Sequence, residues 1–314
     1  MKKIIICVLS LSIIIVGALS VAALSKDEVS AIENKENLSI QSGEATSSGK
    51  VVDLKTLNTQ KENIFNNILN CVDYYDSVKG TFETTFIDSS PTTISYNVNI
   101  PKQISLQEAK SENIHLNVIC KDGTFLEADN NEKKYIENRF ISQYDETKRK
   151  KHTSNINEEV ELFEYRNYEK IDVSRERVRK NANGEMEYYY RTDITNANMA
   201  ATSINPQNLV FGFMSEFDSW KVTGIEEYLG RQVIVIKGKT ADKAYANKLK
   251  VDVFEMQFDL KTGVLLDFKG YLSDETLTQY LTTTEFSVDQ KDNTLNEEIG
   301  ECISFVQSSY EKMK

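Results

Sequence analysis

Residues 220–289 have the pattern of an antiparallel meander, and this stretch constrains the fold more than any other part of the chain. Residues 251–259 alternate between apolar and polar side chains, and residues 264–271 and 277–288 continue the pattern. Such alternation places successive side chains on opposite faces of a strand. We therefore expect a sheet with one wet face and one aromatic-rich face. The aromatic-rich face is predicted to hold Phe254, Met256, Phe258, Phe268, Tyr280 and Phe286.

Three other segments have the periodicity of helices. Residues 57–75 carry apolar side chains at spacings of three and four, which predicts an amphipathic helix. Asn205-Pro206 is typical of a helix start, and Leu209, Phe213 and Phe217 follow it at helical spacing. Residues 291–314 contain a C-terminal amphipathic helix, which we expect to pack on the domain.

Two short stretches carry a resemblance to a known family. Residues 224–231, Gly-Ile-Glu-Glu-Tyr-Leu-Gly-Arg, and residues 258–266, Phe-Asp-Leu-Lys-Thr-Gly-Val-Leu-Leu, resemble the LolA/RseB-like superfamily. That superfamily includes outer-membrane lipoprotein carriers and sigma-factor regulators, and the chain looks like its exported Gram-positive branch. The resemblance implies an α+β fold, an incomplete antiparallel β-barrel whose concave face is covered by helices. It also implies binding of a lipid, an acyl chain or an apolar peptide, without catalysis.

The aromatic face has two interpretations. In the first, it is ordinary core and the helices cover it completely. In the second, the helices cover it incompletely and leave an apolar pocket for an acyl chain or an apolar peptide. The second interpretation predicts ligand-binding residues on the sheet and on a lid helix: Phe254, Met256, Phe258, Phe268, Tyr280, Phe286, Leu209, Phe213 and Phe217.

The N-terminal sequence predicts export. Residues 4–24 are uncharged and apolar, long enough to span a membrane, whereas the small residues at their end suit cleavage. Residues 1–24 are therefore a signal peptide or a signal anchor, an N-terminal apolar helix before the domain. Lys2 and Lys3 precede this run, which places the body of the protein outside the cytoplasm. The polar residues 25–55 are predicted to be a flexible linker, and residues 56–290 the half-barrel domain.

Composition and motifs disfavour several classes of function. The net charge of −11 disfavours a nucleic-acid partner. Only two histidines occur, and no HExxH, GxSxG, phosphate-loop or EF-hand pattern is present, so we expect neither an enzyme nor a bound metal or cofactor. Two hypotheses remain. The first is a membrane-tethered or secreted carrier or sensor of an apolar ligand, and the second is a cell-envelope module that binds a protein partner and has a filled core.

The cysteines leave two alternatives. Beyond the leader, Cys71, Cys120 and Cys302 allow one disulfide with a spare thiol, or three free thiols, and no pair has CxxC spacing. We expect three free thiols.

Overall fold

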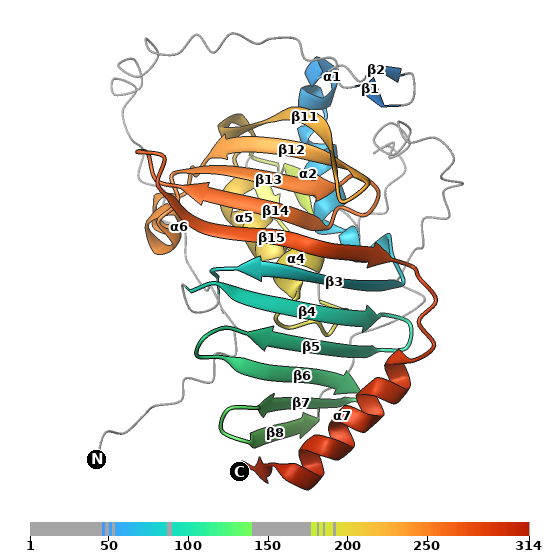
Figure 1. Cartoon of the computed structure of the whole chain (residues 1–314). Coiled ribbons are helices and arrows are strands. Elements are labelled where there is room, and N and C mark those ends of the chain that lie inside the picture. Colours follow the sequence, from blue (N-terminus) through green and yellow to red (C-terminus); the bar gives the residue numbers. More distant parts are fainter. Residues whose placement is uncertain are drawn as a thin grey trace. The chain divides into compact units, whose positions relative to one another are not determined.

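A large twisted sheet dominates the computed structural model (Figure 1). The structure describes residues 46–47, 50–51, 54–86, 90–139, 177–180, 182–184, 186–190 and 193–313. The expected leader, residues 1–24, and most of the expected linker, residues 25–55, lie outside the described residues. Within the described part of the chain, no helix combines the length and the apolar character needed to cross a membrane.

Twelve strands of the described chain form this sheet, in the order β11-β12-β13-β14-β15-β3-β4-β5-β6-β7-β8-β16. Neighbouring strands are antiparallel except for β8 and β16, which are parallel. In sheet order the strands are β11 (Trp220–Tyr228), β12 (Arg231–Lys239), β13 (Val253–Asp259), β14 (Leu265–Tyr271), β15 (Leu277–Val288), β3 (Ser77–Thr84), β4 (Thr92–Asn99), β5 (Ile104–Lys110), β6 (His115–Lys121), β7 (Thr124–Asp129), β8 (Lys134–Arg139) and β16 (Glu311–Lys312). The architecture is an α+β fold built on an open, barrel-like sheet.

The remaining described elements are short. Two pairs of strands form small separate sheets, β1 (Thr46–Ser47) with β2 (Lys50–Val51) and β9 (Val178–Lys180) with β10 (Met186–Tyr188). The helices are α1 (Leu54–Thr59), α2 (Lys61–Leu69), α4 (Ala201–Ile204), α5 (Gln207–Met214), α6 (Lys243–Leu249) and α7 (Leu295–Ser309).

The predicted meander is confirmed by the strand register. Met256 of β13 pairs with Phe268 of β14 and with Ile236 of β12, so these three side chains share one face. The helices α4 and α5 pack against this face, and α5 also contacts α2. A buried hydroxyl links α4 to β14, since Ser203 Oγ donates to the Leu265 carbonyl at 2.8 Å.

The helices cover opposite faces of the two halves of the sheet. In the half formed by β5–β8, Leu106 pairs with Ile119, and both pack in the cluster that contains α7. On the other face of β5, Gln107 Oε1 accepts hydrogen bonds from the backbone N–H groups of Met199 and Ala200, at 3.0 and 3.1 Å. These two residues lead directly into α4, so α4 and α7 lie on different faces.

The sheet is strongly curved at the β11–β12 end. Leu229 and Gly230 form the connecting turn, with φ values of 52° and 70°, which is the geometry of a tight two-residue hairpin. Tyr228 Oη donates to the Thr283 carbonyl of β15 at 2.7 Å, although β12, β13 and β14 lie between β11 and β15 in the sheet. The hairpin therefore folds back across the sheet, as expected for an open barrel.

The two motifs that carry the family resemblance meet in space. Arg231, which ends the first motif, makes two hydrogen bonds to the Asp259 carboxylate of the second, at 2.6 and 3.0 Å. The same carboxylate accepts from the Thr262 backbone N–H at 2.9 Å and from its hydroxyl at 2.6 Å. These bonds hold the turn in which Gly263 adopts a φ of 75°, a conformation that favours glycine. One buried carboxylate thus joins a hairpin end to the next turn.

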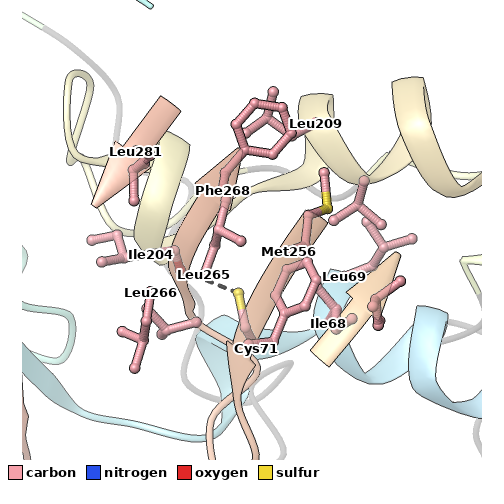
Figure 2. Packing of buried hydrophobic residues seen from close by; sticks show 14 of the residues in the cluster. Ile68, Leu69, Cys71, Ile204, Leu209, Met256, Leu265, Leu266, Phe268 and Leu281 are labelled. Atoms are coloured by element: carbon pink, nitrogen blue, oxygen red, sulfur yellow. Dashed lines mark hydrogen bonds between the residues drawn. The ribbon is translucent and has the colours of Figure 1, made fainter. Parts of the chain in front are cut away.

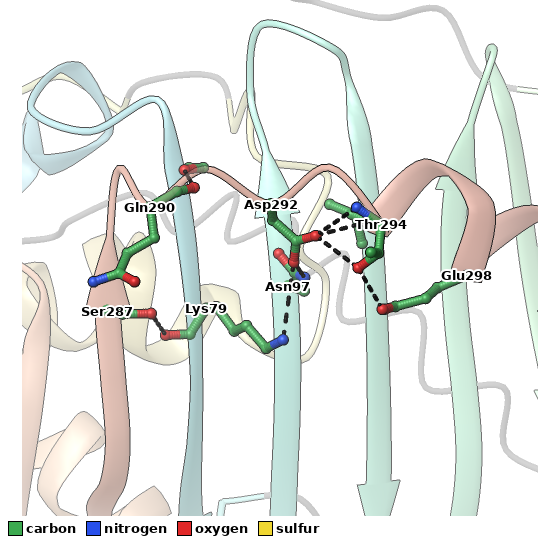
Figure 3. A network of polar contacts seen from close by, with 9 residues as sticks. Lys79, Asn97, Ser287, Gln290, Asp292, Thr294 and Glu298 are labelled. Atoms are coloured by element: carbon green, nitrogen blue, oxygen red, sulfur yellow. Dashed lines mark hydrogen bonds and ion pairs between the residues drawn. The ribbon is translucent and has the colours of Figure 1, made fainter.

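Helix α7 is anchored to the sheet by Asp292, as Figure 3 shows. Asp292 Oδ1 accepts from the backbone N–H groups of Thr294 and Leu295, at 2.9 and 3.0 Å, and so caps the start of α7. Its other oxygen accepts from Asn97 Nδ2 of β4 at 2.8 Å. The Asn97 hydrogen bond, with the capping bonds, lowers the pKa of Asp292 to about 2.

Replacing Asp292 by alanine is expected to destabilise the protein in a pH-dependent way. Because the folded-state pKa lies below the ordinary value of 3.8, the stabilisation is complete above about pH 4 and is lost as the pH falls towards 2. Since the carboxylate is partly exposed, we expect a loss of only about 1 kcal/mol at neutral pH. Urea unfolding of both proteins at pH 2.5 and pH 7 checks this, and an equal difference at the two pH values would contradict it.

The three cysteines of the described chain are free thiols, as expected from the sequence. Cys71 and Cys120 are buried and Cys302 is half-buried. Burial raises the pKa of Cys120 to about 11, so this thiol stays protonated at neutral pH.

Candidate functional site

Aromatic side chains form a layer between α5 and the sheet. The Phe213 ring of α5 lies 5.1 Å from Phe254 and 5.2 Å from Phe268, measured between ring centroids. Phe86 continues the layer at 5.3 Å from Phe268. Phe213, Phe254 and Phe268 are each at most 1% exposed. Figure 2 shows this region, with Leu209 of α5 facing Phe268 and Met256 of the sheet.

A second aromatic group lies against α5 and the adjoining segments. Phe211 of α5 lies 5.7 Å from Phe65 of α2 and 5.8 Å from Tyr188. Tyr190 packs over Phe211 at 4.3 Å and is 60% exposed. Phe65 also contacts Phe217 at 5.5 Å. Aromatic contacts therefore run from the protein surface at Tyr190 to the fully buried Phe65.

The sequence of α5 explains why one short helix can contact aromatic side chains in both groups. It reads Gln-Asn-Leu-Val-Phe-Gly-Phe-Met, with Phe211 and Phe213 on either side of Gly212. A Cβ atom at Gly212 would lie 2.1 Å from the Tyr245 ring, so glycine is needed for Tyr245 of α6 to approach the helix. Tyr245 Oη in turn donates to the Asn208 carbonyl at 3.2 Å. A helix that is apolar on most of its surface is stable only between two apolar layers.

The structure brings together most of the residues that the pocket interpretation named. They lie in one large buried cluster with part of α2: Leu209, Phe213, Phe254, Met256, Phe258 and Phe268. Phe217 packs against this cluster from the Phe65 side, where it also contacts Trp220 at 6.0 Å. Whether these side chains bind a ligand stays a prediction.

Of the two residues predicted on β15, Phe286 packs against this cluster, whereas Tyr280 does not. Tyr280 pairs with Lys269, on the face opposite Phe268, and its hydroxyl donates to Glu83 Oε1 at 2.5 Å. A β-bulge between Thr283 and Glu285 then shifts the register of β15. The extra residue puts Tyr280 and Phe286 out of phase. Phe286 is half-buried, with the Arg231 guanidinium 5.2 Å from its ring centroid.

The site contains polar groups whose pKa values are shifted by burial. Burial raises the pKa of Tyr188 to about 12, and its hydroxyl donates to the Ser215 carbonyl at 2.6 Å. Lys61 lies over the Trp220 ring at 5.0 Å and donates to the Phe217 and Trp220 carbonyls. Burial lowers the pKa of Lys61, with Asp218 opposing that effect. Within the described residues, no group of acidic, histidine or cysteine side chains has the geometry of a metal site.

Sequence reasoning missed three tyrosines of the site, namely Tyr188, Tyr190 and Tyr245. The only sequence signal was the run Tyr188-Tyr189-Tyr190, which is equally typical of a strand. Only the fold brings Tyr190 onto Phe211 and Tyr245 onto Phe213.

Comparisons with known proteins find similarity at the level of structure. No protein-family model matches the sequence, and no curated protein is significantly similar. The MucB structure solved with MucA from Pseudomonas aeruginosa is similar over 76% of this chain, with 11% identity and a TM-score of 0.39. The aligned region spans 60% of that chain, less than two-thirds of its length.

Two further solved structures are lipoprotein-related. Lipoprotein LppX of Mycobacterium tuberculosis is 8% identical over 76% of this chain and 99% of its own, with a TM-score of 0.35. A putative outer-membrane lipoprotein-sorting domain of Vibrio parahaemolyticus is 9% identical over 76% and 98%, with a TM-score of 0.24.

Proposed function

We propose that this chain is an extracytoplasmic, non-enzymatic binding protein that holds an apolar ligand against α5. The ligand is an acyl chain or an apolar peptide, and the role is that of a carrier or a sensor. The observation that carries the proposal is the continuity of aromatic contacts around α5. They begin at the exposed Tyr190, which packs on Phe211 at 4.3 Å, and continue to Phe65 at 5.7 Å.

Helix α5 is the element that would move to admit a ligand. It is only eight residues long, and it packs on aromatic rings at Phe211 and at Phe213. A displaced α5 would exchange contacts with aromatic rings for contacts with an acyl chain. Burial of apolar ligand surface supplies roughly 25 cal/mol for each Å² removed from water, so a fatty acyl chain can offset the lost packing.

Export and tethering complete the proposal. Residues 1–24 support an extracytoplasmic location on the sequence pattern described above, either as a cleaved leader or as a membrane anchor. A tethered binding protein would take its ligand from the membrane or sense it there.

A second function is favoured by a different observation. The rings of Phe213, Phe254 and Phe268 contact one another and are almost fully buried, as in a filled core. A filled core suits a regulatory module of the cell envelope that binds a protein partner and no small ligand. Ligand binding at Tyr190 distinguishes the two functions.

Replacing Tyr190 by alanine is expected to weaken binding of palmitate about three- to tenfold. Truncation removes an aromatic ring that covers apolar surface of the bound ligand, at a cost of about 0.5–1.5 kcal/mol in affinity, whereas stability changes little because Tyr190 is 60% exposed. Affinity is measured by titration, following the fluorescence of Trp220, the one tryptophan of the chain. Leu277→Ala is the matched control, since Leu277 is an exposed apolar side chain, 48% exposed, on β15. Equal affinities of the two variants would contradict the proposed site.

A further inference from the structure

The two edges of the sheet differ in whether another strand pairs with them. At one end, β8 is covered by β16: the N–H groups of Glu311 in β16 and of Met313, which follows it, donate to the Lys133 and Tyr135 carbonyls, at 2.9 and 2.8 Å. At the other end, β11 pairs with β12 on one side, and no strand of the described chain pairs with its other side. An open edge offers backbone donors and acceptors to another extended chain.

Helix α1 closes this edge at one residue. Asn58 Nδ2 donates to the Val222 carbonyl at 2.9 Å, and Asn58 Oδ1 accepts from the Val222 N–H at 2.9 Å. The side-chain amide therefore makes the two hydrogen bonds that a neighbouring strand would make. Both backbone groups of Val222 must point away from β12, towards the edge.

The hairpin turn fixes which later residues also point to the edge. Tyr228 and Arg231 flank the two-residue turn, so their backbone groups bond to each other across the hairpin. Alternation along β11 then directs the backbone groups of Glu227 and Ile225 outwards. The bulge between Val222 and Gly224 adds one residue to β11. With that extra residue, the same alternation directs the backbone groups of Val222 outwards, as its hydrogen bonds to Asn58 require. No described residue hydrogen-bonds to the outward groups of Ile225 or Glu227.

The side chains along this edge leave it open and make it acidic. Glu226 and Glu227 are exposed, and neither makes an ion pair with a described residue. A Cβ atom at Gly224 would meet no other residue closer than the Glu226 carboxylate, at 3.9 Å. A glycine in a strand often marks a place where another backbone approaches closely. Exposed charges on an edge also oppose pairing with an identical edge.

We propose that the β11 edge from Gly224 to Tyr228 binds an extended segment of a partner protein that carries Lys or Arg at alternate positions. The segment extends the sheet by hydrogen bonding to Ile225 and Glu227. Glu226 and Glu227 project to opposite faces of β11, so the basic side chains, which share one face of the added strand, lie beside one of these two glutamates. A second copy of this chain is disfavoured, because pairing two such edges brings glutamates of like charge together. This site is separate from α5, and it does not depend on ligand binding there.

The probe is a synthetic peptide of alternating Lys and Val residues, compared with its Glu-Val counterpart. With the full domain, we expect saturable binding of the Lys-Val peptide only, together with slower amide hydrogen exchange at Ile225 and Glu227. Glu227→Pro removes an outward N–H and leaves the pairing with β12 intact. It should weaken binding about three- to tenfold, the value of one hydrogen bond. Glu226→Lys/Glu227→Lys should reverse the preference to the Glu-Val peptide.

Absence of saturable Lys-Val binding would overturn the proposal. So would protection at other strands, or equal binding by the Glu227→Pro variant with an unchanged melting temperature. Concentration-dependent dimerisation that protects the same amides would instead assign the edge to a second copy, and would also overturn it. Palmitate titration of the same samples reports separately on the α5 site, so failure of one proposal is distinguishable from failure of the other.

Discussion

Replacing Phe213 by alanine is expected to lower the free energy of unfolding by about 3–5 kcal/mol, the usual cost of truncating a buried phenylalanine. Phe213 is 1% exposed and contacts Tyr245, Phe254 and Phe268, with ring centroids 5.0–5.2 Å apart. Truncation removes apolar contacts on the helix and on the sheet and leaves a cavity between them. Urea unfolding followed by circular dichroism gives the difference.

The matched control is Phe305→Ala in α7. The same atoms are removed, but Phe305 is 58% exposed, so its loss should cost less than about 1 kcal/mol. If Phe213→Ala cost no more than Phe305→Ala, the layer between α5 and the sheet would not be packed as described. Restored stability of Phe213→Ala in saturating palmitate would further support a ligand in that layer.

Replacing Asp259 by alanine is expected to destabilise the protein by about 3–5 kcal/mol, because breaking a buried ion pair leaves an uncompensated charge. The Asp259 side chain is 1% exposed and pairs with Arg231, which is 22% exposed. The variant also loses both hydrogen bonds to Thr262, so the turn at Gly263 should loosen. Denaturant unfolding measures the loss, and hydrogen exchange at residues 260–264 localises it.

Glu255→Ala is the control for Asp259→Ala. Glu255 lies on the same strand and the same face, and its pair with Lys237 at 2.7 Å is more exposed. Such a surface pair contributes about 0–1 kcal/mol. Equal losses in the two variants would show that Asp259 does not join the two motifs. Arg231→Ala combined with Asp259→Ala should cost less than the sum of the single changes, because the two residues act as one pair.

The sequence predicted the parts of the fold that local periodicity determines. Phe254, Met256 and Phe258 alternate without interruption, and they lie on one buried face. The same reasoning failed at Tyr280, because nothing local in Thr283-Thr284-Glu285 signals the bulge that shifts the register of β15. A bulge is set by what both neighbouring strands require, and the paired residues of β3 lie about two hundred residues earlier in the chain.

The sequence predicted only those residues of the candidate site that lie in periodic segments. Phe213 and Phe254 each belong to a segment with a clear period, so their segments were identified correctly. Tyr190 packs on Phe211 only because the chain after β10 passes over α5, and no spacing in the sequence encodes that contact. Helix α7 likewise has the amphipathic pattern of a core helix, but the pattern does not state which face of the sheet it covers.

The central claim is that an apolar ligand binds against α5, and fluorescence quenching of Trp220 tests it most directly. The Trp220 indole donates to the Met214 carbonyl at the end of α5, at 2.8 Å, and packs on Phe217. Titration with a brominated fatty acid is compared with the same acid without bromine. We predict saturable quenching by the brominated acid alone, displaced by palmitate. Absence of quenching, or quenching that rises linearly without saturation, would contradict the claim.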